Sequence, residues 1–358
     1  MSEGAARLAA QGVALDALDD RLQLGEDLVL VGRSKAFRRT VEALLQIARH
    51  DVTVLVEGET GTGKELVARA LHQLSGRCRG PFVEINCAAL PGELAESELF
   101  GHLKGAFTHA FDRRVGLVAE AHKGTLFLDE VASLPLPLQA KLLRFLQSGE
   151  YREVGSNRSQ KADVRVVAAA NVPLLSAANE GHFRSDLYYR LAVFRIAVPA
   201  LSERPEDIAP LARHFLDRHA ARLRLPPSCL SMEALARLER HAWPGNVREL
   251  ENRLQRALVQ KPGTELGAED LFEDLEAPAA AAALAGSGCF RDQKAAALRS
   301  FELQYLQNVM RRSRGNVSKA AREAGLHRRA LTALLAKHGL KREAFLSREA
   351  SELKSSHS

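Results

Sequence analysis

The chain has 358 residues, of which 46% are apolar and only 5% aromatic, so it can build two or three cored domains and favours a helix-rich α/β fold over an all-β one. No run of about 18 uncharged apolar residues occurs, and charged residues interrupt positions 1–19, which excludes a transmembrane helix and a signal peptide. The four cysteines lack Cys-x-x-Cys spacing, which favours free thiols in a reducing cytoplasm over a metal site.

The net charge of +6 is unevenly distributed along the chain. Between Arg291 and Arg342, thirteen lysines and arginines stand against three acidic residues, so this segment carries +10 and leaves −4 for the rest. A polyanionic partner is therefore expected at the C-terminal end.

The predicted elements follow a clear order along the chain. Residues 1–28 show weak periodicity and are expected to be a tail or one loosely attached helix. From residue 30 to about 198, short β-branched runs alternate with helical stretches, which predicts a parallel sheet with helices on both faces. The runs expected to form strands are 52–56, 82–85, 125–128, 164–168 and 193–198.

Helical patterns dominate the remainder. Amphipathic helices are expected at 207–220, 231–240 and 246–259. Residues 276–288 form an alanine-rich stretch with few large side chains, which is typical of a linker. A small helical unit is expected between about 294 and 345.

A phosphate-binding loop follows the first of the five strand runs and precedes a helical stretch at 65–74. Its residues are Gly58, Glu59, Thr60, Gly61, Thr62, Gly63 and Lys64. Glycines let backbone N–H groups surround phosphates at a helix N-terminus, and Lys64 would reach the β and γ oxygens. Glu65 replaces the usual Ser or Thr, so Mg²⁺ must use other ligands, such as Thr62 or a second acidic site. The alternative is a glycine-rich turn with a surface lysine.

Two carboxylates follow the apolar run at 125–128. Asp129 is suited to hold Mg²⁺ through water, and Glu130 is suited to polarise an attacking water. Alone, this pattern also fits a solvated strand end. Combined with the upstream loop, it predicts nucleotide hydrolysis at the carboxyl edge of the sheet.

Several long motifs accompany these two. They lie at 58–65, 86–90, 97–102, 105–108, 124–130, 183–191 and 243–250, and they read GETGTGKE, NCAAL, SELFGH, GAFT, GTLFLDE, FRSDLYYRL and WPGNVREL. In these motifs the chain resembles bacterial enhancer-binding activators of sigma-54 RNA polymerase, a branch of the AAA+ ATPases, from residue 30 to about 345. The family pattern also has Glu at the position of Glu65.

The resemblance implies roles for further residues. Asn86 would sense the γ-phosphate through Glu130, and Asn171 would position water as the first sensor. Arg184 and Arg190 would reach the nucleotide of a neighbouring subunit, and Arg248 would be the second sensor in a helical lid. Arg184 or Arg190 taken alone also fits a surface salt bridge. Fingers acting in trans imply a ring, usually a hexamer, and a dimer when inactive.

The match breaks at the loop that contacts sigma-54 in this family. Its residues here are Gly105, Ala106, Phe107, Thr108, His109 and Ala110. His109 replaces a glycine, which adopts positive φ more readily. Downstream, Val118 and Ala119 stand where the family commonly has Phe-Glu. Either the loop still acts on sigma-54 polymerase, or the chain is a divergent AAA+ DNA-binding regulator that no longer acts through sigma-54.

The basic C-terminal segment predicts three helices. The first presents Leu298, Phe301, Tyr305 and Val309 on one face; the second, at 317–324, is capped by Asn316; Gly325 makes the turn to the third, at 328–337. This pattern resembles a Fis-type helix-turn-helix, and a generic three-helix bundle is the alternative. Arg328, Arg329 and Thr332 are the expected base or phosphate contacts, and Lys319, Arg322 and Lys337 the expected backbone contacts.

The sequence thus predicts a cytoplasmic, ATP- and Mg²⁺-dependent transcription activator whose partners are sigma-54 RNA polymerase, double-stranded DNA and further copies of itself, with no membrane. The predicted parts are a tail at 1–28 without a sensory domain, an AAA+ α/β core at 29–200, a helical lid at 201–275, a linker at 276–293, the helix-turn-helix domain at 294–345 and a tail at 346–358. Control by a separate inhibitory protein or by expression level is expected. Competing interpretations are a replication-type AAA+ ATPase and a DNA-binding repressor with a vestigial ATPase.

Overall fold

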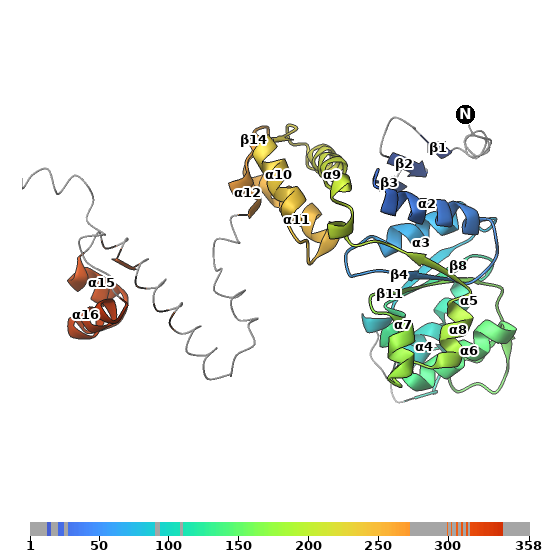
Figure 1. The fold of residues 1–358 in the computed structure, drawn as a ribbon. Coiled ribbons are helices and arrows are strands. Elements are labelled where there is room, and N and C mark those ends of the chain that lie inside the picture. Colours follow the sequence, from blue (N-terminus) through green and yellow to red (C-terminus); the bar gives the residue numbers. More distant parts are fainter. Residues whose placement is uncertain are drawn as a thin grey trace, which may run out of the picture. The chain divides into compact units, whose positions relative to one another are not determined.

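The computed structural model describes residues 21–24, 28–89, 94–107, 110–272 and 316–338, the backbone of 13–15, and positions 299, 302, 306, 309, 310 and 313. The chain divides into two compact units, residues 1–271 and 272–358 (Figure 1). In the described part of the chain, no helix has both the length and the apolar composition needed to cross a membrane.

A five-stranded parallel sheet forms the centre of the first unit. Its strands are β4 (Val54–Glu57), β5 (Phe82–Asn86), β8 (Thr125–Asp129), β11 (Arg165–Ala170) and β12 (Phe194–Ala197). They pair in the order β12-β4-β11-β8-β5. The predicted parallel sheet is confirmed, and each predicted strand lies within two residues of the observed one.

Two apolar cores cover the two faces of this sheet. Successive residues of β8 alternate between them: Leu126 and Leu128 belong to one core and Phe127 to the other. Helices α2 (Lys35–Ala48) and α3 (Lys64–Gln73) pack on the Phe127 face. The opposite face carries α4 (Ala95–Phe100), α5 (Leu117–Glu120), α6 (Leu136–Ser148), α7 (Leu174–Asn179) and α8 (Ser185–Leu191) (Figure 1). Burial on both faces explains why the strands read as continuous apolar runs.

The N-terminal region corrects one expectation. Strands β1 (Val13–Leu15), β2 (Arg21–Leu24) and β3 (Leu28–Val31) form an antiparallel sheet. Leu22 and Leu24 are 5% and 2% exposed and join the core that α2 and α3 share. The prediction of a tail or one loosely attached helix for 1–28 is therefore wrong at these strands. A strand of four residues is too short for its alternation of apolar and polar side chains to stand out from the polar sequence around it.

Two short antiparallel pairs lie beyond the sheet. One joins β6 (Gly101–His102) to β7 (Arg114–Val115), and the other joins β9 (Glu150–Tyr151) to β10 (Gln160–Lys161). Backbone bonds connect the two pairs, because Leu103 N donates to Val154 O at 3.0 Å and Val154 N to Gly101 O at 2.8 Å. The 3₁₀ helices η1 (Cys87–Ala89) and η2 (Val131–Ser133) follow β5 and β8.

A helical lid follows β12. Its elements are η3 (Leu201–Glu203), η4 (Pro205–Asp207), α9 (Ile208–Leu223), β13 (Cys229–Leu230), α10 (Met232–Arg240), α11 (Asn246–Gln260), β14 (Glu265–Leu266) and α12 (Ala268–Phe272). The three predicted helices are confirmed. Ser231 caps α10 by accepting a hydrogen bond from Ala234 N. Trp243 is 1% exposed and donates from Nε1 to Leu238 O at 2.8 Å, which fixes the turn between α10 and α11.

The second unit contains two described helices, α15 (Val317–Glu323) and α16 (Arg328–Lys337). Asn316 caps α15, since its Oδ1 accepts from Ser318 N and Lys319 N at 3.1 Å each. Gly325 has φ +65° at the turn between the helices. Ala320, Ala321, Leu331 and Leu335 are buried in the core that these helices share. Leu298, Phe301 and Tyr305 of the predicted first helix lie outside the described residues.

Candidate nucleotide-binding site

The phosphate-binding loop connects β4 to α3. Gly61 and Gly63 have φ of +80° and +100°, and a Cβ at Gly61 would lie 2.4 Å from Gly245 O, so the loop requires glycine there. Thr62 Oγ1 donates to Glu59 O at 2.8 Å and stabilises the loop. The loop leads directly into the N-terminus of α3, and a glycine-rich loop that ends at a helix N-terminus is suited to bind phosphate.

Lys64 is held at the base of the loop. Its side chain is 8% exposed, and Nζ donates to Gly58 O at 2.8 Å and to Glu59 O at 2.9 Å. Burial lowers the pKa of Lys64, while the nearby carboxylates of Asp129 and Glu130 act in the opposite direction. An ammonium that is only partly compensated in this way is suited to accept an anionic ligand.

The acidic pair lies at the end of β8. Asp129 is the last residue of the strand and pairs in register with Asn86 of β5. Glu130 has φ +52°, and its N–H donates to Asp129 Oδ1 at 3.0 Å. Gly58 N donates to Ala170 O at 3.2 Å, so the loop also contacts the end of β11, which Asn171 follows. The structure thus brings the predicted loop, acidic pair and Asn171 to one edge of the sheet, where open α/β sheets bind ligands.

Asn86 is oriented by its own turn. Its Oδ1 accepts from Ala88 N at 2.9 Å and from Ala89 N at 3.3 Å, which caps η1. The next residue, Cys87, is buried, and burial together with the charges of Asp129 and Glu130 raises the pKa of its thiol to about 12. A thiol with this pKa stays protonated and unreactive at neutral pH.

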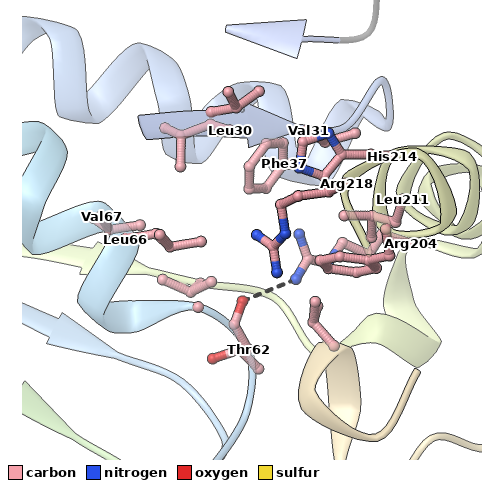
Figure 2. Close-up of a pocket in the computed structure, with 15 residues that line it drawn as sticks. Leu30, Val31, Phe37, Thr62, Leu66, Val67, Arg204, Leu211, His214 and Arg218 are labelled. Atoms are coloured by element: carbon pink, nitrogen blue, oxygen red, sulfur yellow. Dashed lines mark hydrogen bonds between the residues drawn. The ribbon is translucent and has the colours of Figure 1, made fainter. Parts of the chain in front are cut away.

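A cavity of about 300 Å³ beside the loop completes the site, and sequence reasoning missed it (Figure 2). Its apolar walls come from β3, α2, α3 and α9, and include Leu30, Phe37, Val67 and Leu211. Polar groups at its margin are Thr62, Arg204, His214 and Arg218. An apolar slot of this size next to a phosphate loop fits a nucleoside base. The lining residues come from segments far apart in the sequence and form no local motif.

The lid docks on the loop through the start of α11. Asn246 is fully buried with φ +51°, and its Nδ2 donates to Glu59 Oε2 at 2.9 Å and to Thr60 O at 3.1 Å. Its Oδ1 accepts from Leu201 N at 2.7 Å. Arg248 N donates to Gly61 O at 3.3 Å, which places this predicted lid residue next to the loop. Asn246 was not among the predicted site residues.

Within this chain, three of the predicted site residues pair with groups other than the phosphate loop and the acidic pair. Glu65 pairs with Arg69 at 2.7 Å on the surface of α3. Arg184, the N-cap residue of α8, pairs with Asp186 at 2.7 Å, and Arg190 donates to Leu146 O at 2.7 Å. Both arginines are exposed, and these contacts hold them to their own subunit.

The predicted sigma-contact loop extends from the β6–β7 pair. Gly105 has φ +79°, and its N–H donates to Ala110 O at 2.8 Å. The ring of Phe107 meets that of His102 edge to face at 5.0 Å, and Ala106 packs against Gly155. Thr108 and His109 lie outside the described residues.

In the second unit, the predicted DNA contacts lie on exposed helix surface. Lys319 and Arg322 belong to α15, and Arg328, Arg329, Thr332 and Lys337 belong to α16. Thr332 Oγ1 donates to Arg328 O at 2.9 Å, and Lys337 pairs with Glu302 at 2.8 Å. Arg328 and Arg329 begin α16, which is where a recognition helix contacts base edges.

Comparison with known proteins follows the same division of the chain. Residues 30–197 match the Sigma-54 interaction domain, 202–286 the AAA+ ATPase lid domain, and 297–338 the Fis family of bacterial regulatory proteins. The structure resembles that of NtrX from Brucella abortus in complex with ADP, with a TM-score of 0.67 and 35% identity over 88% of this chain and 70% of that one.

Individual relatives of known family lead to the same assignment. The Sigma54-dependent transcriptional activator SfnR of Pseudomonas putida is 53% identical over 228 residues, which are 64% of this chain and 62% of the relative. The transcriptional regulatory protein ZraR of Klebsiella oxytoca is 44% identical over 86% of this chain and 68% of its own length. The chain therefore spans about two thirds of the length of these relatives. Its P-loop AAA+ domain implies nucleotide binding and ATPase activity, and the chain belongs to the family of sigma-54-dependent transcriptional activators.

Proposed function

We propose that this chain hydrolyses ATP to remodel sigma-54 RNA polymerase from the closed to the open complex, at promoters near which its helix-turn-helix domain binds DNA. The observation that carries the proposal is the convergence of Lys64, Asp129 and Glu130 at one sheet edge, beside a cavity that fits a base. The interaction domain named in the family match and the names of the relatives support the choice of polymerase.

Within one subunit, the chemistry falls to a few side chains. The loop N–H groups and Lys64 bind the triphosphate, and the carboxylate of Glu130 accepts a hydrogen bond from the attacking water and orients it. The oxygen donors of Asp129 and Thr62 fit a hard divalent cation. Mg²⁺ held there would neutralise charge on the phosphate oxygens. Asn86 and Asn171 flank the acidic pair and are proposed to sense the γ-phosphate and to position water.

The site is completed by a neighbouring subunit. Arg184 caps the start of α8, Arg190 lies on this helix, and both are exposed, so a ring, expected to be a hexamer, would bring them to the next subunit's nucleotide. There a guanidinium stabilises the charge that develops on the transferred phosphoryl group. The positive charge of Arg248 contributes to the lowered pKa of Lys64. Arg248 is proposed to transmit the nucleotide state to the lid.

The polymerase and DNA contacts are proposed to use other segments of the chain. Residues Gly105 to Ala110 are proposed to contact sigma-54, with Phe107 and Thr108 at the contact. Arg328, Arg329 and Thr332 of α16 are proposed to enter the major groove, while Lys319, Arg322 and Lys337 contact the phosphate backbone.

Open-complex formation by purified sigma-54 polymerase on a cognate promoter tests the proposal. The native chain should support opening in the presence of ATP, while Glu130→Gln should bind ATP but hydrolyse it at least about 100-fold more slowly and fail to open the promoter. If the native chain hydrolyses ATP, binds the promoter and still does not support opening, the proposed coupling is wrong.

One observation favours a second candidate function. His109 stands in place of the family's glycine in the sigma-contact loop, so the chain could act with another form of polymerase. The same assay with His109→Gly distinguishes the two. Opening by the native chain supports the first function, opening by the variant alone supports loss of sigma-54 contact through His109, and opening by neither supports a divergent regulator.

A further inference from the structure

A buried carboxylate joins the lid to the start of α2. Asp207 is the last residue of η4 and is 0% exposed. Its Oδ1 accepts from Arg33 N at 2.6 Å and from Ser34 N at 2.7 Å, and its Oδ2 accepts from Ser34 Oγ at 2.8 Å. Three donors are thus bound by a residue more than 170 positions away. Charge-assisted bonds in a buried setting hold this segment more firmly than neutral ones would.

Ser34 transmits this restraint to the wall of the base cavity. As the N-cap of α2, its Oγ also accepts from Phe37 N at 3.1 Å. The ring of Phe37 lines the cavity. Gly32 shows how closely these groups pack, because a Cβ there would lie 2.4 Å from the Phe37 ring and 2.9 Å from Asp207 Oδ2.

The same short segment of the lid supplies Arg204, which also lines the cavity. Its side chain is 2% exposed, its guanidinium lies 5.0 Å from the centroid of the Phe37 ring, and it donates to Thr62 O at 3.1 Å (Figure 2). Its Nε is buried and has no hydrogen-bond partner among the described residues. Residues 204–207 therefore contact both the aromatic wall of the cavity and the phosphate loop.

We propose that Asp207 is a positioning residue for base recognition: it holds Phe37 and Arg204 in the arrangement that accepts a nucleoside base. Asp207 does not touch the ligand and acts through Ser34. This inference rests on the proposed function, because it takes the ligand to be an adenine nucleotide. It separates two contributions to binding: the loop and Lys64 bind the phosphate chain, whereas the affinity for the base depends on the contact between Asp207 and Ser34.

Binding of two probes by the full chain tests the inference, with ADP and inorganic tripolyphosphate titrated separately by calorimetry. Asp207→Ala leaves three donors unpaired, two of them buried, and should weaken ADP binding about tenfold, while tripolyphosphate binding stays within about twofold of native. Asp207→Asn keeps an acceptor oxygen and should restore most of the ADP affinity. Glu206→Ala, at the exposed neighbouring position, is the matched control and should alter neither affinity.

A steady-state assay gives an independent readout. Asp207→Ala should raise KM for ATP about tenfold with kcat within about twofold, since Lys64 and Glu130 are untouched. If both probes weaken equally, or kcat falls with KM unchanged, Asp207 has only a general structural role and the inference is overturned. Should Asp207→Ala fail to fold, Ser34→Ala decides between these outcomes, because it removes only the relay to Phe37. Failure of the native chain to bind ADP would refute the proposed function instead.

Discussion

The N-terminal strand β2 provides a direct test of how the core is built. Leu24 is 2% exposed and packs into the core that α2 and α3 share. Truncating a buried leucine to alanine costs about 2–5 kcal/mol, and β2 lies on the periphery of this core, so we expect a loss of about 3 kcal/mol for Leu24→Ala. For a unit of this size, that loss lowers Tm by about 6–12 °C.

The measurement can use the chain's own fluorophore. Trp243 is the only tryptophan and is 1% exposed in the lid, so its emission reports unfolding of the first unit in urea or on heating. Gln23→Ala is the matched control, since Gln23 is exposed on the other side of the same strand, and should cost less than about 1 kcal/mol. If Leu24→Ala is no more harmful than Gln23→Ala, residues 21–24 are a loosely attached tail and the packing argument is wrong.

The same strand has a consequence for the nucleotide site. β2 pairs with β3, and Leu30 and Val31 of β3 line the base cavity. Deleting residues 1–24 would leave β3 as an unpaired edge. We therefore expect the deletion to lower nucleotide affinity as well as stability, and ADP would raise the Tm of the truncated chain less than that of the native chain.

Three further perturbations follow from single contacts. Asn246→Gly keeps the positive φ but removes two hydrogen bonds from the lid to the phosphate loop and a third to Leu201 N within the lid, so it should cost about 2–3 kcal/mol in urea unfolding; a loss below about 1 kcal/mol would contradict this. Burial lowers the pKa of His72, and the nearby charge of Arg165 lowers it further. As the pH falls through 6.5, the ordinary histidine value, His72 therefore binds a proton in the unfolded chain before it does so in the folded chain, and the folded state loses stability. Tm should therefore fall between about pH 7.5 and 5.5, and His72→Gln should reduce that fall; an equal fall in both chains would exclude His72 as its source. Asn316→Ala removes the cap of α15, so it should lower the free energy of unfolding by about 1 kcal/mol and weaken DNA binding in a fluorescence-anisotropy titration. Asn316→Ser should retain most of the stability and most of the DNA affinity. If the two variants behave equally, the role assigned to the cap is wrong.

The parts of the fold that follow local rules could be predicted from the sequence. Strands buried on both faces leave continuous apolar runs, so all five sheet strands were found within two residues. The phosphate loop and the acidic pair were found because glycines, Lys64 and Asp129 must occupy fixed places relative to a strand end. Asn316 and Gly325 were recognised for the same reason, as capping and turning chemistry is local.

The parts that depend on distant contacts could not be predicted. The base cavity draws Phe37, Thr62 and Arg204 from three separate segments, and no single segment has a pattern of its own. Asp207 looks in the sequence like an acidic residue in the first turn of a helix, yet its partners are Arg33 and Ser34. The sequence places Asn246 only at the start of a predicted helix, whereas its side chain joins the lid to the loop.

The strength of these contacts separates the parts of the site that must stay fixed from those that must move. Asp207 and Asn246 are fully buried and make three side-chain hydrogen bonds each, so the loss of either set would strongly lower the free energy of unfolding. The ion pair between Arg184 and Asp186 is about half exposed on both sides, and exposed pairs contribute only about 0–1 kcal/mol. Arg184 can therefore leave Asp186 at little cost, as its proposed contact with a neighbouring subunit's nucleotide requires. The proposed ring needs this combination: a base cavity that is fixed within each subunit, and an arginine at the start of α8 that is held weakly enough to change partners.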